Sequence, residues 1–237
     1  MTERHIVAMG GGQWWQWPPD PIFPFLFELA GTAKPKVLYV PTATGDNDRG
    51  VAMFYRSFPA HSFEPSDLGL FERTVEDLRS FVLAQDVVLV AGGNTLNMLA
   101  IWRGHGLDTV LRDAWEAGVI MAGGSAGANC WFEASTTDSY LMGNADPLPD
   151  GLGLVTGSFC PHYDSEPSRQ PAYRALVADG TLPPGIACDD LAAAHMLGAD
   201  LAEIVVSAEG SGARRVEPDD RGGASETVLP VRLLEGP

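Results

Sequence analysis

The sequence predicts an α/β protein in which helices cover both faces of a mostly parallel sheet, a three-layer α/β/α arrangement. Short apolar runs alternate along the chain with segments of helical spacing, and this alternation is typical of strand–helix–strand units. Two of the runs end in glycine turns, at the strand ends where such sheets gather ligands. A length of 237 residues favours a single domain spanning 1–237.

Strands are expected where an apolar run is ended by a turn signal. In the first half of the chain these runs are 5–9, 36–40, 63–70, 86–91 and 119–122. Helical spacing is found in 25–30, 51–58, 74–84, 96–102 and 107–117, the last with Gly118 as its stop signal. After Ser139 the periodicity weakens, and only 185–188, 203–207 and 227–232 resemble strands.

The aromatic segment 13–27 contains Trp14, Trp15 and Trp17. We expect it to pack in the core, because large aromatic side chains are mostly buried. A hydrophobic lid over the site is the alternative. The three cysteines, Cys130, Cys160 and Cys188, have neither disulfide nor metal spacing. They are therefore expected to be buried small residues.

The charge of the chain argues against several classes of partner. The formal net charge is −16 and the sequence pI about 4.5. Nucleic-acid binding needs clustered Lys and Arg, and anionic membranes attract basic segments, so neither partner is expected. No apolar run approaches the length of a membrane span, and no signal peptide is apparent. We expect a cytoplasmic protein.

The run 123–127, Gly-Gly-Ser-Ala-Gly, is a Gly-x-Ser-x-Gly turn directly after an expected strand. A nucleophilic serine must stand clear of the sheet on a sharp turn, where glycine relieves crowding. Ser125 is therefore the candidate nucleophile. The N–H of Ala126 at the next helix start and those of Gly92 and Gly93 are candidate oxyanion donors. The alternative is a small-residue turn that packs strand against helix without catalysis.

A serine nucleophile needs a base. The five histidines are His5, His61, His105, His162 and His195. His162 follows an apolar run on a proline-marked turn, where a base on a strand-end loop would lie. The other four are interpreted as structural or solvent-facing.

A carboxylate must orient the base. Asp189 and Asp190 end a short expected strand and are the first candidates; the competing carboxylates are Glu133, Asp138, Asp164 and Glu166. With Asp190 the chain order is Ser-His-Asp, whereas the common α/β-hydrolase order is Ser-Asp-His. The turn therefore belongs to a different fold.

Several of these runs together resemble the peptidase E (aspartyl dipeptidase) family, which also includes cyanophycinase-like enzymes. The resemblance covers roughly residues 6–195 and rests on the runs 41–46, 91–95, 124–129, 137–139 and 161–163. It implies an α/β/α fold related to class I glutamine amidotransferases, with no metal or cofactor required.

The resemblance also implies roles for individual residues. Ser125 matches the nucleophile, His162 the base and Asp190 the acid, with Asp189 one position out of register. Gly92 and Gly93 match the oxyanion loop. The resemblance further implies substrate contacts by Asn94, Asp138 and Arg169. However, the Gly-Glu-Thr-Arg-type run of aspartyl dipeptidases is replaced by 165–171, Ser-Glu-Pro-Ser-Arg-Gln-Pro, which leaves a preference for N-terminal Asp open.

The sequence thus predicts a serine-type peptidase, a dipeptidase or exopeptidase acting on short peptides. A small serine carboxypeptidase or an esterase or amidase on the same fold is one alternative. A non-catalytic binding protein on the amidotransferase-like fold is another. A homodimer is one alternative for the assembly.

Overall fold

The computed structural model describes residues 3–12, 20–57 and 62–236. The tryptophan-rich part of the expected aromatic segment, with Trp14, Trp15 and Trp17, lies outside these residues, as does His61. The rest of that segment contributes α1 (Ile22–Leu29), which begins a few residues before the predicted helix at 25–30. None of the helices in the described ranges is long and apolar enough to cross a membrane.

The larger sheet is built around the parallel strands that the sequence predicts. Its strand order in the described chain is β14 (Val231–Leu233), β11 (Asp200–Val206), β10 (Ala192–Leu197), β1 (His5–Met9), β5 (Ile120–Gly124), β4 (Val87–Val90), β2 (Lys36–Val40) and β3 (Glu64–Asp67). The adjacent strands β1, β5, β4, β2 and β3 are all parallel to one another. In contrast, β10 is antiparallel to both β1 and β11. All four residues of β4 are buried, as expected for a parallel strand covered on both faces.

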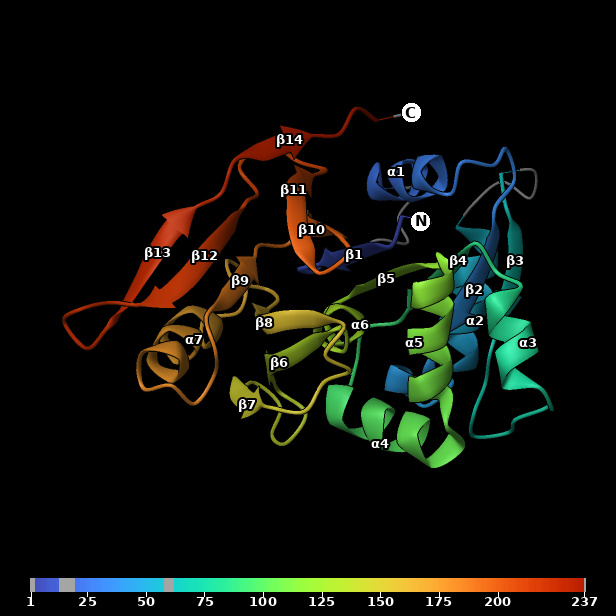
Figure 1. Ribbon diagram of the computed structural model, residues 1–237, viewed down its shortest axis with the longest axis horizontal. Coiled ribbons are helices and arrows are strands. Elements are labelled where there is room, and N and C mark those ends of the chain that lie inside the picture. The colour runs from blue at the N-terminus through green and yellow to red at the C-terminus, as the bar shows by residue number, and fades with distance from the viewer. Residues whose placement is uncertain (1–2, 13–19, 58–61, 237) are drawn as a thin grey trace.

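Helices cover both faces of this parallel region. The remaining helices of the first half are η1 (Thr42–Thr44), α2 (Asp48–Arg56), α3 (Leu78–Leu83), α4 (Thr95–His105), α5 (Leu107–Ala117) and α6 (Ala126–Asn129). Because side chains alternate along a strand, Ile6 and Ala8 join the core beneath α3, α4 and α5, while Val7 and Met9 join the core beneath α1 and α2. Figure 1 shows α1 and the pair α4 and α5 on opposite sides of β1 and β5.

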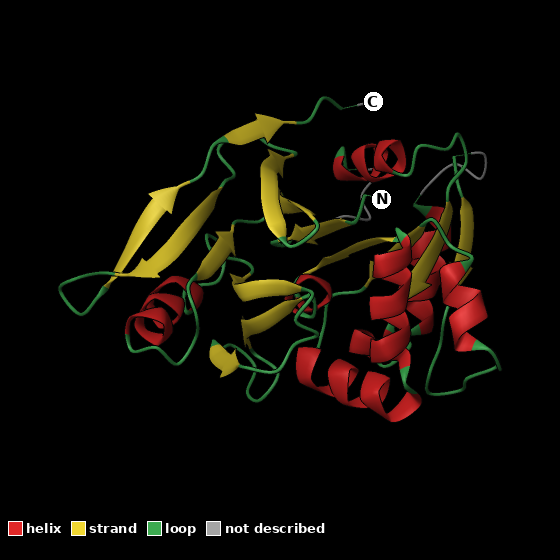
Figure 2. Cartoon of the chain, viewed as in Figure 1, coloured by secondary structure: helices red, strands yellow, loops and turns green. Residues whose placement is uncertain are grey.

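A second sheet extends the molecule. Its order in the described chain is β13 (Ala224–Val228), β12 (Ala213–Pro218), β9 (Gly185–Cys188), β8 (Val155–Cys160), β6 (Phe132–Thr137) and β7 (Asp146–Leu148). The helix α7 (Arg169–Ala178) packs on it through Tyr173 and Val177. Phe132 and Phe159, whose stacked rings are 4.8 Å apart, continue the core of the first sheet into the second. Helices concentrate around the first sheet and strands dominate the second (Figure 2).

The predicted α/β fold class is confirmed, with strands divided between two sheets. Most predicted elements of the first half are present, but the helix expected at 74–84 begins only at Leu78, because Asp77 accepts a hydrogen bond from the Ser80 N–H and caps it. The strand expected at 227–232 is two strands, β13 and β14, which belong to different sheets. The sequence reading missed β6, β7, β8, β10, β12 and α7 as elements.

The three cysteines are free and buried, which confirms the prediction made from their spacing. Burial raises the pKa of the Cys160 thiol to about 12. It also raises the thiol pKa values of Cys130 and Cys188.

Candidate active site

Ser125 lies between β5 and α6 in a conformation that side chains rarely adopt, with φ 55° and ψ −115°. The two outer glycines of the Gly-x-Ser-x-Gly turn permit this sharp bend. A side chain on Gly123 would overlap the backbone of Gly127, and one on Gly127 would overlap the carbonyl of Val90. The outer glycines of the motif are therefore a packing requirement of the strand–turn–helix junction.

The end of β1 holds this turn and two other segments. The carbonyl of Met9 accepts a hydrogen bond from the N–H of Ser125 (3.1 Å), that of Gly10 from the N–H of His162 (3.1 Å), and that of Gly11 from the N–H of Leu191 (2.9 Å). Three consecutive carbonyls thus bring together segments that are far apart in the sequence.

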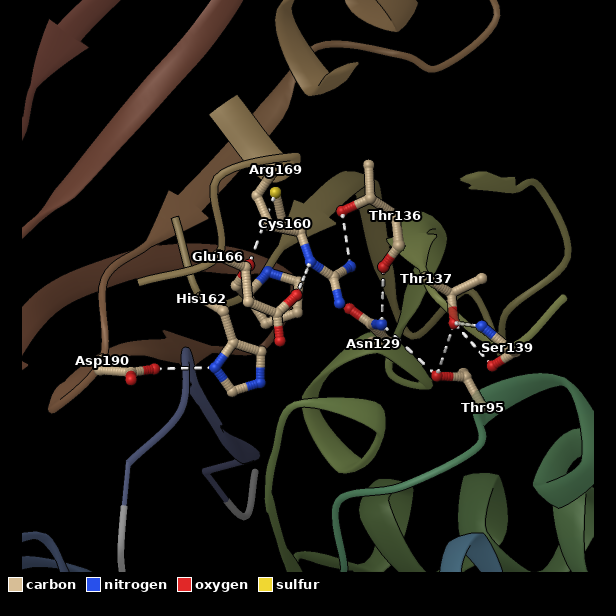
Figure 3. A network of polar contacts seen from close by, with 11 residues as sticks. Thr95, Asn129, Thr136, Thr137, Ser139, Cys160, His162, Glu166, Arg169 and Asp190 are labelled. Atoms are coloured by element: carbon tan, nitrogen blue, oxygen red, sulfur yellow. Dashed lines mark hydrogen bonds and ion pairs between the residues drawn. The ribbon is translucent and has the colours of Figure 1, made fainter. Parts of the chain in front are cut away.

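The imidazole of His162 lies against Asp190. The distance from Nδ1 to Oδ1 is 2.8 Å, and Figure 3 shows the carboxylate facing the ring. The hydrogen bond with His162 lowers the pKa of the Asp190 carboxyl, against the opposing effect of burial. The backbone N–H of Asp190 in turn donates to Asp164 at 2.8 Å. The carboxylate is therefore ionised and placed to hold the ring with a proton on Nδ1.

The other candidate acids have different partners. Asp189 forms an ion pair with Arg214 at 2.9 Å, although burial raises its pKa. Glu133 accepts a hydrogen bond from the N–H of Gly157, and Glu166 pairs with Arg169. The geometry therefore distinguishes Asp190 from its neighbour Asp189, which sequence reasoning could not do.

The candidate oxyanion donors lie beside the serine. Ala126 is the first residue of α6, so the helix itself has no acceptor for its N–H. A Cβ on Gly92 would be 3.4 Å from the Cβ of Ser125, which places this turn in contact with the serine. Gly93 has φ 138° and approaches the carbonyl of Ala43 too closely for a side chain.

A cavity of about 570 Å³ opens at this site. Ser125, His162 and Gly92 line it, together with the end of β1, residues of β2 and β4, and one face of α2. Ser125 and His162 therefore share a cavity large enough for a small ligand.

The residues expected to contact substrate lie elsewhere. The Asn94 side chain caps α4 by accepting from the N–H of Asn97, and it donates to the carbonyl of Ser139 at 3.1 Å. Arg169 is only 2% exposed, and its Nε is 2.6 Å from the carboxylate of Glu166 (Figure 3). Asp138 is half-buried. None of the three is among the described residues that line the cavity, and their substrate roles stay predictions.

Sequence reasoning missed two parts of the site. Gly11 contacts both His162 and Asp190 so closely that a Cβ would overlap their side chains. The triple glycine after β1 was a signal of this close approach. The face of α2 that lines the cavity, with Arg49 and Met53, left no comparable signal, because its residues are ordinary for an exposed helix.

The chain is similar in sequence to known peptidases. Residues 6–204 match the model described as Peptidase family S51. The uncharacterized peptidase YgaJ of Bacillus subtilis (strain 168) is 42% identical over 234 residues, which are 98% of this chain and 99% of the relative.

Solved structures share the fold. A peptidase from an acI-B1 actinobacterium superposes with a TM-score of 0.70 at 16% identity, covering 97% of this chain and 95% of the other. A putative peptidase E protein from Listeria monocytogenes EGD-e gives 0.61 at 18% identity, covering 86% and 97%. At these identities the likeness concerns the fold alone.

Proposed function

The chain belongs to peptidase family S51 and is a peptidase of the peptidase E type, and from this premise we propose that it hydrolyses short peptides with a triad of Ser125, His162 and Asp190. The observation that carries the proposal is the end of β1. Its consecutive carbonyls hold the N–H groups of Ser125, His162 and Leu191, the residue after Asp190. The imidazole and Asp190 are already hydrogen-bonded.

In the proposed reaction, the Oγ of Ser125 attacks the peptide carbonyl while Nε2 of His162 accepts its proton. Asp190 accepts the hydrogen bond from Nδ1–H and stabilises the imidazolium. The proton then passes to the leaving amine as the C–N bond breaks. Water attacks the acyl-serine, again with His162 as base, and releases the acid and free Ser125.

The oxyanion of each tetrahedral intermediate would accept hydrogen bonds from the N–H of Ala126 and from the turn at Gly92 and Gly93. Each such donor contributes about 3–4 kcal/mol of transition-state stabilisation in studied enzymes. The size of the cavity, about 570 Å³, supports a small substrate such as a dipeptide or the end of a short peptide. A preference for N-terminal Asp is one specificity to test.

The first test is hydrolysis of Asp-X dipeptides, other dipeptides, longer peptides and simple esters by the wild type and Ser125→Ala. We expect peptide cleavage that falls by at least about 1,000-fold in the variant. Ser225→Ala changes an exposed serine on β13 and should keep wild-type activity.

A serine-reactive phosphonate gives an independent readout. It should label the wild type and Ser225→Ala but leave Ser125→Ala unlabelled. Cleavage of esters alone would favour an esterase. Full hydrolysis by Ser125→Ala would refute the proposed triad, and an unlabelled, inactive wild type would favour a binding protein.

A further inference from the structure

The wall of the cavity beside Ser125 is mainly apolar and aromatic. Tyr39 and Phe54 stack with ring centroids 4.9 Å apart, and Met53 and Leu89 extend this surface. Phe54 is only 6% exposed, so the stacked pair is a firm part of the core. A ligand that enters would bury its own apolar groups against this wall.

Two hydrogen-bond donors of the same cavity, on Arg49 and Tyr39, have no acceptor among the described residues. The guanidinium of Arg49 makes no hydrogen bond or ion pair with the part of the chain that the structure describes, while its backbone N–H is held by the Asn47 side chain at 2.9 Å. The hydroxyl of Tyr39 likewise has no partner among the described residues. Burial raises the pKa of Tyr39, so the hydroxyl stays protonated and able to donate.

Gly50, the residue after Arg49 in α2, lies beside the hydroxyl of Tyr39. A Cβ on Gly50 would be 3.3 Å from the Tyr39 hydroxyl. Glycine is a poor helix residue, and here its missing side chain leaves the hydroxyl uncovered. Arg49 therefore directly precedes, in α2, the residue whose backbone borders the Tyr39 hydroxyl.

The charge of the cavity is opposite to that of the molecule. The chain carries a formal net charge of −16, yet no Asp or Glu is found among the described residues that line the cavity, and Arg49 is its only Lys or Arg. The guanidinium of Arg49, an exposed residue of the cavity lining, and the half-buried Tyr39 hydroxyl together match a carboxylate in charge and hydrogen-bonding capacity.

We infer that this cavity is a substrate subsite in which Arg49 and the Tyr39 hydroxyl bind a carboxylate of the peptide while its apolar part contacts Phe54 and Met53. The inference rests on the proposed peptidase function. Two sources supply such a carboxylate: the free C-terminus of the peptide and an acidic side chain. Both bring an anion to the Arg49 and Tyr39 donors, which have no acceptor among the described residues.

The test compares matched substrates that differ only in charge. One pair is the same short peptide with a C-terminal carboxylate or a carboxamide, and the other begins with Asp or Asn. The enzymes are wild type, Arg49→Gln, Arg49→Lys and Tyr39→Phe. Arg56→Gln is the control, because it removes the same charge from the exposed end of the same helix, outside the described lining.

One of the two substrate pairs carries the carboxylate that the subsite binds. For that pair, Arg49→Gln should lower kcat/KM by about 10- to 100-fold for the anionic peptide and leave kcat/KM for the neutral peptide unchanged. Arg49→Lys should retain part of the preference, and Tyr39→Phe should lose a smaller part. Loss of discrimination in the C-terminal pair identifies the peptide terminus; loss in the N-terminal pair identifies a side chain. Equal effects of Arg49→Gln and Arg56→Gln on all four substrates would overturn the inference.

A binding measurement separates this inference from the proposed function. Calorimetry with Ser125→Ala, with and without Arg49→Gln, reports the affinity for each peptide without turnover. If no peptide is cleaved by the wild type, the proposed function fails, yet a carboxylate preference that Arg49→Gln removes would still support the subsite. Affinity that does not depend on Arg49 would overturn the subsite even if Ser125 is catalytic.

Discussion

At the scale of single residues, the main feature is the strained backbone of Ser125. A non-glycine residue at φ 55° and ψ −115° costs on the order of 1–3 kcal/mol. The strain is held in the backbone at the start of α6, so a substitution of Ser125 that relieves it should stabilise the fold.

The first prediction compares two inactive variants. Ser125→Gly removes the Cβ that this conformation disfavours, whereas Ser125→Ala keeps it. We expect Ser125→Gly to be more stable than Ser125→Ala by about 1 kcal/mol in the free energy of unfolding by urea. Equal stabilities would mean that the turn relaxes and that the serine is held without strain.

A second residue-scale prediction concerns Gly11. Gly11→Ala would push its methyl group into the Asp190 carboxylate and the His162 ring, so the pair must separate. A displacement of about 1 Å in a catalytic group can cost roughly 100-fold, and we expect kcat/KM to fall by at least that factor. Gly104→Ala is the matched control, because nothing lies within 4 Å of a Cβ there. Wild-type kinetics in Gly11→Ala would argue against a role for this pair.

At the scale of elements, four strands of the first sheet meet in a cluster of titratable side chains. His195 on β10 is 7% exposed, and its Nε2 is 3.0 Å from Nδ1 of His5 on β1. Its Nδ1 is 3.2 Å from Glu203 on β11, which also pairs with Arg232 on β14. The edge of Phe25 packs on the His195 ring. The cluster therefore joins all of the strands on this side of β1.

This cluster predicts a pH dependence of stability. Burial lowers the pKa of His195 from its ordinary 6.5, with Glu203 opposing the shift and His5 adding to it. The unfolded chain therefore takes up the proton at a higher pH than the folded protein does, and acid favours unfolding as the pH falls below 6.5. The urea midpoint of His195→Gln should fall less steeply than that of the wild type between pH 7 and 5. An unchanged slope would assign the acid sensitivity to other groups.

Elements also explain what the sequence could and could not predict. The run Val87–Val90 is apolar on both faces, so it is recognisable locally as a central parallel strand. The strand β12, Ala213–Pro218, contains two arginines and a glutamate, so its own residues do not mark it as a strand. Such strands form because their partners supply the pairing, and one sequence does not show the partners.

The same limit applies to the candidate site. Ser125 could be found from its turn, because the glycines that the bend requires are adjacent in the chain. The choice between Asp189 and Asp190 depends on which neighbour each faces after β9. Asp189 meets Arg214 of the second sheet, and Asp190 meets His162. These contacts join distant segments, and no local pattern encodes them.

At the scale of the whole molecule, the three buried thiols report the integrity of both sheets. Cys130 and Cys188 belong to the core of the first sheet and Cys160 to that of the second. Because burial raises their pKa values, a disulfide reagent such as Ellman's should find no reactive thiol in the native protein and three in denaturant. Iodoacetamide should leave peptide hydrolysis unchanged. Rapid native labelling with loss of activity would favour a cysteine nucleophile.

The position of β1 has a consequence for folding while the protein is being synthesised. This strand precedes both of its neighbours, β5 and β10, in the chain, and the carbonyl of Gly11 accepts its hydrogen bond from the N–H of Leu191. Domains generally fold as units once their partners have emerged, and long-range pairing is slow. A nascent chain therefore cannot bring Ser125, His162 and Asp190 together until β10 has been translated, so we expect partly synthesised chains to lack the proposed activity.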